Sequence, residues 1–360
     1  MIRTLVMIIL FVIITFSETY ALKRPEVEFK IFQFPPNMIP CIDGNTKDWD
    51  IVPSDYIIGT DQLFDDTGDR GSNIDPKDFD VKVRVGWVKG LNRLYFIYEA
   101  YDDYWDFARN SLQNDILELV VDGDLSGGPF IKQWNPNKEI VSMEELHFSY
   151  HGVHAQNYHI FTPPGNKDWT MVWGCAQWIK DLPYANKAYT YNFKHGESGN
   201  LVLEFWITPF DFSPYKGQEK AVFSKLEENK IIGMSWVILE YDGLEKNEAA
   251  YDLAHKSNMY ADANDLCAFR LMPLEKLFLK PIEAHWSFTV VDMERRLIAF
   301  KDLSYGKISK WIWDFGDGNI SNEQNPIYAF DSSGEKTIVL TIEGAEGKSQ
   351  FARVWDVVLK

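Results

Sequence analysis

Residues 311–319 read WIWDFGDGN, and their pattern is the strongest indication of how the C-terminal part of the chain folds. Its alternating aromatic residues are typical of a half-buried β-strand, and the Asp-Gly pair that follows favours a tight hairpin turn. Further on, residues 337–342 read TIVLTI, in which the two faces of a strand separate with a period of two. The pattern predicts a small antiparallel β structure at this end of the chain.

The order of these features, with Asn325-Pro326 and an alternating Tyr328 and Phe330 between them, resembles a polycystic kidney disease (PKD) domain. That resemblance implies a small immunoglobulin-like sandwich at residues 282–360, with a first strand that begins near Trp286. It also implies a spacer or docking module, so we expect the ligand-binding part of the protein to lie upstream.

The N-terminus is typical of a secretory signal peptide at residues 1–21. Arg3 gives it a positive start, residues 5–16 an apolar core, and residues 19–21 a small-residue cleavage site. The apolar run is too short to span a bilayer comfortably. We therefore expect a secreted protein, extracellular or in the cell envelope, with no membrane insertion after cleavage.

The composition excludes one class of partner and leaves the disulfide state open. Acidic side chains number 53 against 36 basic ones, a formal net charge of -17, which repels phosphate backbones and attracts divalent cations. Nucleic-acid binding is therefore not expected. The cysteines, Cys41, Cys175 and Cys267, are an odd set that allows one disulfide at most.

Between the two ends, residues 22–281 show short strands separated by turn signals and little helical periodicity. Alternation predicts strands at residues 81–87, 94–100, 115–121, 201–207 and 231–239. One short helix is expected at residues 223–229. The fold class that follows is all-β: a large antiparallel β-sandwich, then the small one.

Three motifs of this middle region resemble family 9 carbohydrate-binding modules. They are IDGNTKDW at residues 42–49, NDILELVVD at residues 114–122, and GMSWVIL at residues 233–239. The resemblance implies a β-sandwich that binds sugars, is often stabilised by calcium, and is commonly appended to enzymes that act on polysaccharides.

The same resemblance suggests which residues bind the sugar. Glu118 matches the strand acid that faces the ligand, and Tyr251 lies where one of two clamping aromatic rings is expected. The second ring normally stands three residues before the Asp of the strand, where this chain has Leu112. Tyr104 or Trp105 could supply a replacement.

Other side chains are candidates on chemical grounds. Glu118 shares a strand face with Ile116 and Val120, so it needs a polar partner, which is either a sugar hydroxyl or an arginine such as Arg84. Tryptophan rings pack well against sugar C–H faces, although most are core residues, and Trp134 has the most turn-like surroundings.

Residues 122–128, DGDLSGG, place three side-chain oxygens close together, on Asp122, Asp124 and Ser126. Calcium prefers such oxygen ligands, so the loop is either a calcium site or a simple acidic turn.

We therefore expect a non-catalytic protein that binds a saccharide and takes part in polysaccharide recognition or breakdown. The alternatives are a cell-surface protein whose partners are other extracellular proteins, and an O-glycosyl hydrolase. No nucleophile elbow or phosphate-binding loop is present in the sequence, which makes an enzyme the weaker reading.

Overall fold

A computed structural model describes all but a few short segments of the chain. The residues described are 22–131, 142–174, 176–214, 217–279 and 281–357. They form two compact units, Met1–Pro273 and Leu274–Lys360. The expected signal peptide lies outside the described residues. Within them, no helix is long and apolar enough to cross a membrane.

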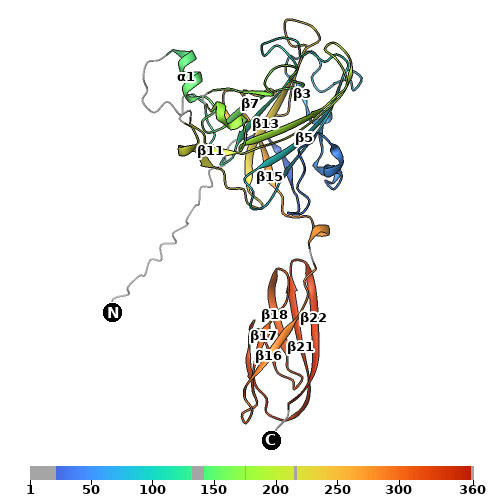
Figure 1. The fold of residues 1–360 in the computed structure, drawn as a ribbon, viewed down its shortest axis with the longest axis vertical. Coiled ribbons are helices and arrows are strands. Elements are labelled where there is room, and N and C mark those ends of the chain that lie inside the picture. Colours follow the sequence, from blue (N-terminus) through green and yellow to red (C-terminus); the bar gives the residue numbers. More distant parts are fainter. Residues whose placement is uncertain (1–21, 132–141, 175, 215–216, 280, 358–360) are drawn as a thin grey trace, which may run out of the picture. The chain divides into compact units, whose positions relative to one another are not determined.

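The large unit, in which Figure 1 labels β3, β5, β7, β11, β13 and β15, consists of two β-sheets that share one strand, β1. The first has the order β8-β7-β6-β13-β15-β1, and the second β1-β4-β5-β10-β9. The bounds are β1 Lys23–Gln33, β4 Phe79–Trp87, β5 Leu94–Asp102, β6 Ile116–Asp122, β7 Gln156–Phe161, β8 Thr170–Val172, β9 Ala185–Thr190, β10 Gly199–Ile207, β13 Ile231–Glu240 and β15 Cys267–Leu271.

Shorter elements complete this unit. Strand β14 (Ala249–Asp252) pairs with β13 and with β3 (Phe64–Asp65), and β2 (Ile58–Gly59) pairs with β4. A separate pair is formed by β11 (Phe210–Phe212) and β12 (Val222–Phe223).

Strand β1 passes from one sheet to the other. Residues up to Ile31 pair with β15, and the last two, Phe32 and Gln33, pair with β4, in both cases in parallel. Because the strand changes partners, the two sheets are continuous at this edge.

The core lies between the two sheets. Phe79 on β4 stacks on Tyr251 on β14 with ring centroids 5.0 Å apart, and Trp169, just before β8, lies 6.0 Å from Phe205 on β10. Strand β6 alternates: Leu117 and Leu119 point into this core, so residues 116, 118 and 120 lie on the outer face of the first sheet.

The strands expected from alternation are all present, as β4, β5, β6, β10 and β13. The short helix expected at residues 223–229 is wrong: Phe223 ends β12, and irregular chain follows. In the described ranges of the large unit, one α-helix is present, α1 (Met143–Tyr150).

The C-terminal unit is a two-sheet sandwich, as predicted. Its sheets have the orders β16-β17-β20 and β19-β18-β21-β22. The bounds are β16 Trp286–Asp292, β17 Leu297–Asp302, β18 Ile308–Asp314, β19 Ile320–Ser321, β20 Ile327–Ala329, β21 Gly334–Gly344 and β22 Gly347–Val357.

The predicted hairpin joins β18 to β19, with Trp313 opposite Ser321. Trp313 is fully buried, and the ring of Phe315 stacks on that of Tyr328 with centroids 3.9 Å apart. The aromatic alternation therefore fills the core of this unit.

Candidate functional site

Glu118 lies on the outer face of the first sheet, opposite His159 on β7 and Val237 on β13. One of its carboxylate oxygens, Oε1, accepts a hydrogen bond from Asn157 Nδ2 at 2.9 Å and lies 3.4 Å from His159 Nε2. The ring of Trp173, which follows β8, lies 5.3 Å from the His159 ring. We call Glu118, Asn157, His159 and Trp173 the outer-face cluster.

The outer-face cluster is almost closed to solvent. Glu118 and His159 are each 7% exposed and Asn157 is 1% exposed, while Trp173 is half-buried. Two polar atoms, Asn157 Oδ1 and His159 Nδ1, have no hydrogen-bond partner among the described residues. An unpaired buried polar atom costs about 1–3 kcal/mol, so these atoms favour a hydrogen-bonding ligand or water.

The surroundings of His159 favour the neutral form of its imidazole. Burial lowers the pKa of His159, and the carboxylate of Glu118 opposes that shift. A neutral imidazole carries one donor and one acceptor nitrogen. The cluster thus combines a carboxylate, an amide and an imidazole that can donate and accept.

The structure does not bring the other predicted ligand residues to Glu118. Tyr251 faces the inter-sheet core, because its strand pairs with β13 in the register that places residue 251 opposite Ile238. Trp105 is 1% exposed, stacks on Phe193 and donates from Nε1 to the Gly199 carbonyl at 2.9 Å. The expectation that these rings clamp a sugar is therefore corrected: both are core residues.

Arg84 is not the partner of Glu118 either. It lies on β4 in the second sheet, where it pairs with Glu99 and donates to the Trp49 carbonyl at 3.0 Å. Tyr104 follows β5, and its hydroxyl approaches Gly243 rather than the outer face. Trp134 lies outside the described residues.

The loop expected to bind calcium closes on itself. Asp122 Oδ2 accepts the Gly127 amide at 2.9 Å, and its Oδ1 accepts the Ser126 amide at 3.3 Å. Asp124 Oδ1 accepts the same Ser126 amide at 3.1 Å. These oxygens are thus used by backbone N–H groups, as in a simple acidic turn.

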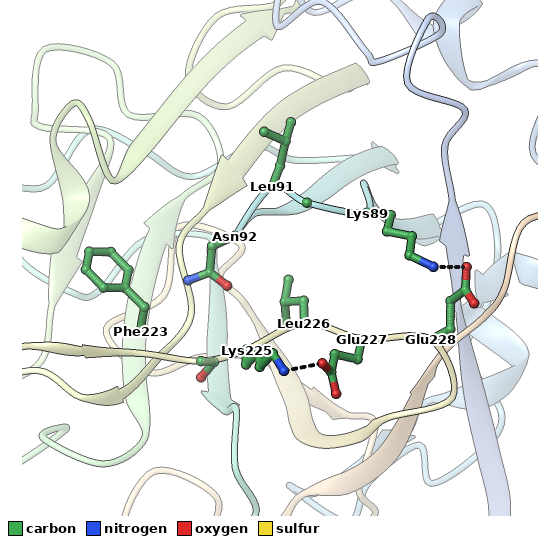
Figure 2. Close-up of a pocket in the computed structure, with 10 residues that line it drawn as sticks. Lys89, Leu91, Asn92, Phe223, Lys225, Leu226, Glu227 and Glu228 are labelled. Atoms are coloured by element: carbon green, nitrogen blue, oxygen red, sulfur yellow. Dashed lines mark hydrogen bonds and ion pairs between the residues drawn. The ribbon is translucent and has the colours of Figure 1, made fainter.

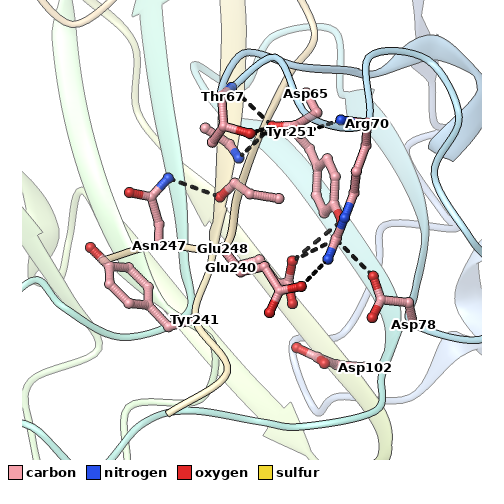
Figure 3. Close-up of polar contacts among 12 residues, drawn as sticks. Asp65, Thr67, Arg70, Asp78, Asp102, Glu240, Tyr241, Asn247, Glu248 and Tyr251 are labelled. Atoms are coloured by element: carbon pink, nitrogen blue, oxygen red, sulfur yellow. Dashed lines mark hydrogen bonds and ion pairs between the residues drawn. The ribbon is translucent and has the colours of Figure 1, made fainter. Parts of the chain in front are cut away.

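A second concentration of carboxylates lies at one end of the large unit, and Figure 3 shows part of it. Asp102 ends β5, Glu240 ends β13, and Asp78 precedes β4. We call these three residues, with Asp103 and Asp242, the end cluster. The carboxylate oxygens of Asp78, Glu240 and Asp242 lie within 4.8 Å of one another, as do those of Asp102, Asp103 and Asp242.

Burial and mutual repulsion raise the pKa values of this cluster. Burial is the largest cause for Asp102 and Glu240, whose pKa values rise to about 7. For Asp242, burial and the neighbouring Glu248 and Glu240 raise the pKa to about 9. Carboxyl groups whose pKa values are raised in this way keep their protons to a higher pH than exposed acids do.

Sequence reasoning did not join Asn157 and His159 to Glu118, and it missed the end cluster. The strand at residues 156–161 carries His159 two residues after Asn157, and this spacing on one face was a usable signal. The acids of the end cluster each follow or precede a predicted strand, but nothing local indicates that those strand ends meet.

An open groove of about 730 Å³ lies next to the β4–β5 turn (Figure 2). Leu91 and Phe223 give it apolar surface, and Phe223 is 48% exposed. Its charges are paired with each other: Lys89 Nζ lies 2.9 Å from Glu228 Oε1, and Lys225 pairs with Glu227. The groove therefore offers one exposed ring and few free polar groups.

Comparison with known proteins identifies the C-terminal unit. Residues 294–357 match the family model described as PKD domain, which confirms that prediction. A crystal structure of the PKD1 domain of Vibrio anguillarum Epp is 21% identical, with a TM-score of 0.21, and the match covers 23% of this chain and 99% of that one.

Over most of its length the chain is similar to a family 9 carbohydrate-binding module from Caldicellulosiruptor kristjanssonii, solved in complex with cellotriose. The match is 14% identical with a TM-score of 0.44, and it covers 71% of this chain and 98% of that one. Collagenase ColA of Bacillus cereus is 40% identical over 43 residues, which are 12% of this chain and 4% of the collagenase.

Proposed function

We propose that the large unit binds a saccharide at the outer-face cluster and that the protein has no catalytic role of its own. The observation that carries this proposal is the convergence of Glu118, Asn157 and His159 on one sheet face beside the Trp173 ring. The three motifs that resemble family 9 carbohydrate-binding modules support it, because one of them contains Glu118.

The chemistry of the cluster suits sugar hydroxyls, which donate and accept at the same oxygen. Glu118 accepts, while Asn157 Oδ1 and His159 Nδ1 are the two atoms without a partner. An indole next to them can pack against the apolar C–H face of a pyranose ring.

The burial of the cluster limits the contact that a ligand can make. A sugar reaches the buried atoms only after the side chains that cover them turn aside, which costs binding free energy. We therefore expect a dissociation constant on the order of 0.1–1 mM, which corresponds to about 4–5.5 kcal/mol.

The remaining parts of the chain fit this role. The PKD domain acts as a spacer or docking module, and an exported protein of this kind takes part in polysaccharide recognition or breakdown. Secretion through residues 1–21 belongs to the same proposal.

Calorimetric titration with cello-, xylo- and manno-oligosaccharides, together with a glycan array, tests the proposal. We expect at least one saturable ligand whose affinity falls at least tenfold in Glu118→Gln, a nearly isosteric change. Phe223→Ala, in the groove of Figure 2, is the matched control and leaves binding unchanged.

Two outcomes would contradict the proposal. Absence of a saturable response across plant, algal and animal glycans would exclude saccharide binding. Loss of binding in Phe223→Ala but not in Glu118→Gln would place the ligand in the groove instead of the outer-face cluster.

A further inference from the structure

The hydrogen-bond donors of the outer-face cluster are directed toward Glu118. Asn157 donates from Nδ2 to Glu118 Oε1 at 2.9 Å, so its other polar atom, the carbonyl oxygen Oδ1, is an acceptor. His159 Nε2 lies 3.4 Å from the same carboxylate oxygen. Because a carboxylate repels a nitrogen lone pair, the proton of the neutral imidazole lies on Nε2, and Nδ1 is an acceptor.

The polar atoms that remain in the cluster are therefore all acceptors. Asn157 Oδ1 and His159 Nδ1 are buried and have no hydrogen-bond partner among the described residues. Glu118 Oε2 likewise accepts no hydrogen bond from the part of the chain that the structure describes. Across the strands, apolar Val237 lies opposite Glu118 and Met171 lies opposite His159, so these neighbours supply no donor. A ligand that completes the cluster must donate hydrogen bonds.

The carboxylate of Glu118 also lacks a positive partner. Its side chain is almost closed to solvent, and among the described residues no lysine or arginine forms an ion pair with it. The nearby His159 does not replace such a partner, because burial lowers the pKa of its imidazole. A buried carboxylate without a cation is costly, and a positive group on the ligand offsets that cost.

We propose that the saccharide bound at the outer-face cluster is an amino sugar, whose ammonium group lies against Glu118, Asn157 and His159. This inference rests on the proposed function and names the chemical class of its ligand. An ammonium has three N–H donors and no acceptor, which matches the three acceptor atoms of the cluster. A sugar hydroxyl donates only once, and its own lone pairs find no free donor there.

The remaining ring of the cluster and the charge of the chain also suit a cationic sugar. The indole ring of Trp173 is half-buried, and its centroid lies 5.3 Å from that of His159. An indole face attracts a cation and packs against sugar C–H groups. The formal net charge of -17 favours the approach of any cationic ligand, so the experiment has to separate this general attraction from the cluster.

Three β-1,4-linked disaccharides that differ at carbon 2 test the proposal. They are built from glucose, which has a hydroxyl there, from glucosamine, which has an amine, and from N-acetylglucosamine, which has a neutral amide. Each is titrated into the whole protein by calorimetry at about pH 6, where the sugar amine is protonated. We expect the glucosamine disaccharide to bind at least tenfold more tightly than either neutral one, because its hydrogen bonds are charge-assisted.

Two variants that each remove one negative charge show where the preference arises. Glu118→Gln weakens binding of the glucosamine disaccharide at least tenfold more than binding of the neutral ones. Asp69→Asn, at an exposed position of the same unit, keeps the preference of the natural protein. If Glu118→Gln fails to fold, the comparison of the three disaccharides on the natural protein still decides the proposal.

The possible outcomes separate the amino-sugar proposal from the proposed function. A neutral saccharide that binds as tightly as the glucosamine disaccharide, or more tightly, would overturn the choice of an amino sugar and leave the saccharide site in place. A preference that persists in Glu118→Gln, or that is lost in Asp69→Asn, would show that the charge of the whole protein selects the amine. Absence of a saturable response to all three disaccharides and to the glycan array would overturn both.

Discussion

Substitution of two glycines in the turn after β18 allows the cost of backbone strain to be compared with the cost of a steric clash. Gly316 and Gly318 both have positive φ, +72° and +95°. A Cβ on Gly316 would lie 2.6 Å from the Thr337 carbonyl oxygen, whereas nothing lies within 4 Å of a Cβ on Gly318. The two positions therefore share one source of strain and differ in the other.

We expect Gly318→Ala to cost about 1 kcal/mol, from the left-handed backbone alone. Gly316→Ala should cost at least twice as much, because the Thr337 backbone cannot move aside without shifting β21. Urea unfolding of both variants measures the difference. Equal losses would show that the turn relaxes and that the steric conflict has no consequence.

The carboxyl groups of Asp66 and Asp252 form a close pair, which makes the stability of the folded protein depend on pH. Burial, together with contact and repulsion from Asp252, raises its pKa from 3.8 to about 7. The folded protein thus keeps a proton that the unfolded chain releases near pH 4. The contribution of Asp66 to the stability of the folded protein is therefore fully present at low pH. It falls as the pH rises from about 4 to about 7, and it is lost above about pH 7.

Asp66→Asn should therefore raise the unfolding temperature at pH 8 and change it little at pH 4.5. The matched control is Asp69→Asn, an exposed acid in the same loop. Thermal unfolding at the two pH values measures the difference. A gain from Asp66→Asn that is equal at both pH values would contradict this reading of the pair.

Among the elements of the large unit, Glu204 on β10 connects the motif at residues 42–49 to the second sheet. Glu204 on β10 is fully buried, and its Oε1 accepts the Trp49 indole N–H at 2.9 Å. Its Oε2 accepts the backbone amides of Asp43 and Gly44 at 3.0 and 3.1 Å. One carboxylate thus fixes the turn and the buried tryptophan against the second sheet.

Glu204→Gln should destabilise the protein by about 1–3 kcal/mol, because an amide nitrogen then faces an N–H donor. Glu28→Gln removes the same charge from an exposed pair with Arg270 and should cost less than about 1 kcal/mol. Denaturant unfolding measures the free energy of unfolding of the two variants. Similar losses would mean that Glu204 stabilises the sandwich only by its bulk.

Elements also show which parts of the structure could be predicted from the sequence. Alternation identified β4, β5, β6, β10 and β13, because each has one face in the core. It also placed Glu118 on one strand face with Ile116 and Val120, and the structure shows that this is the outer face. Alternation does not reveal which strands are neighbours, so the partners Asn157 and His159 were not identified.

Tyr251 and the end cluster are two further cases in which the sequence does not reveal which strands are neighbours. The side of the sheet that Tyr251 occupies is fixed by the pairing of β14 with β13, which is a tertiary property. Asp78, Asp102 and Glu240 are distant in sequence and meet because three strand ends converge. Local sequence carries no signal for that convergence, whereas the PKD hairpin is local and was predicted in detail.

At the scale of the whole molecule, each unit has its own hydrophobic core. The large core contains residues from both sheets of the first unit, and a separate core around Trp286, Trp313 and Phe330 belongs to the second. Since stability comes mainly from burial within a core, we expect the units to unfold as separate cooperative transitions.

Differential scanning calorimetry should therefore resolve two transitions that respond to different changes. Glu204→Gln should lower only the transition of the large unit, because Glu204 and its hydrogen-bond partners Trp49, Asp43 and Gly44 all lie within that unit. Gly316→Ala should lower only the transition of the C-terminal unit, where the turn contacts β21. The double variant Glu204→Gln/Gly316→Ala should then lower both transitions, each by the amount measured for its own single variant. A single transition that both changes shift would show that the two cores unfold as one body.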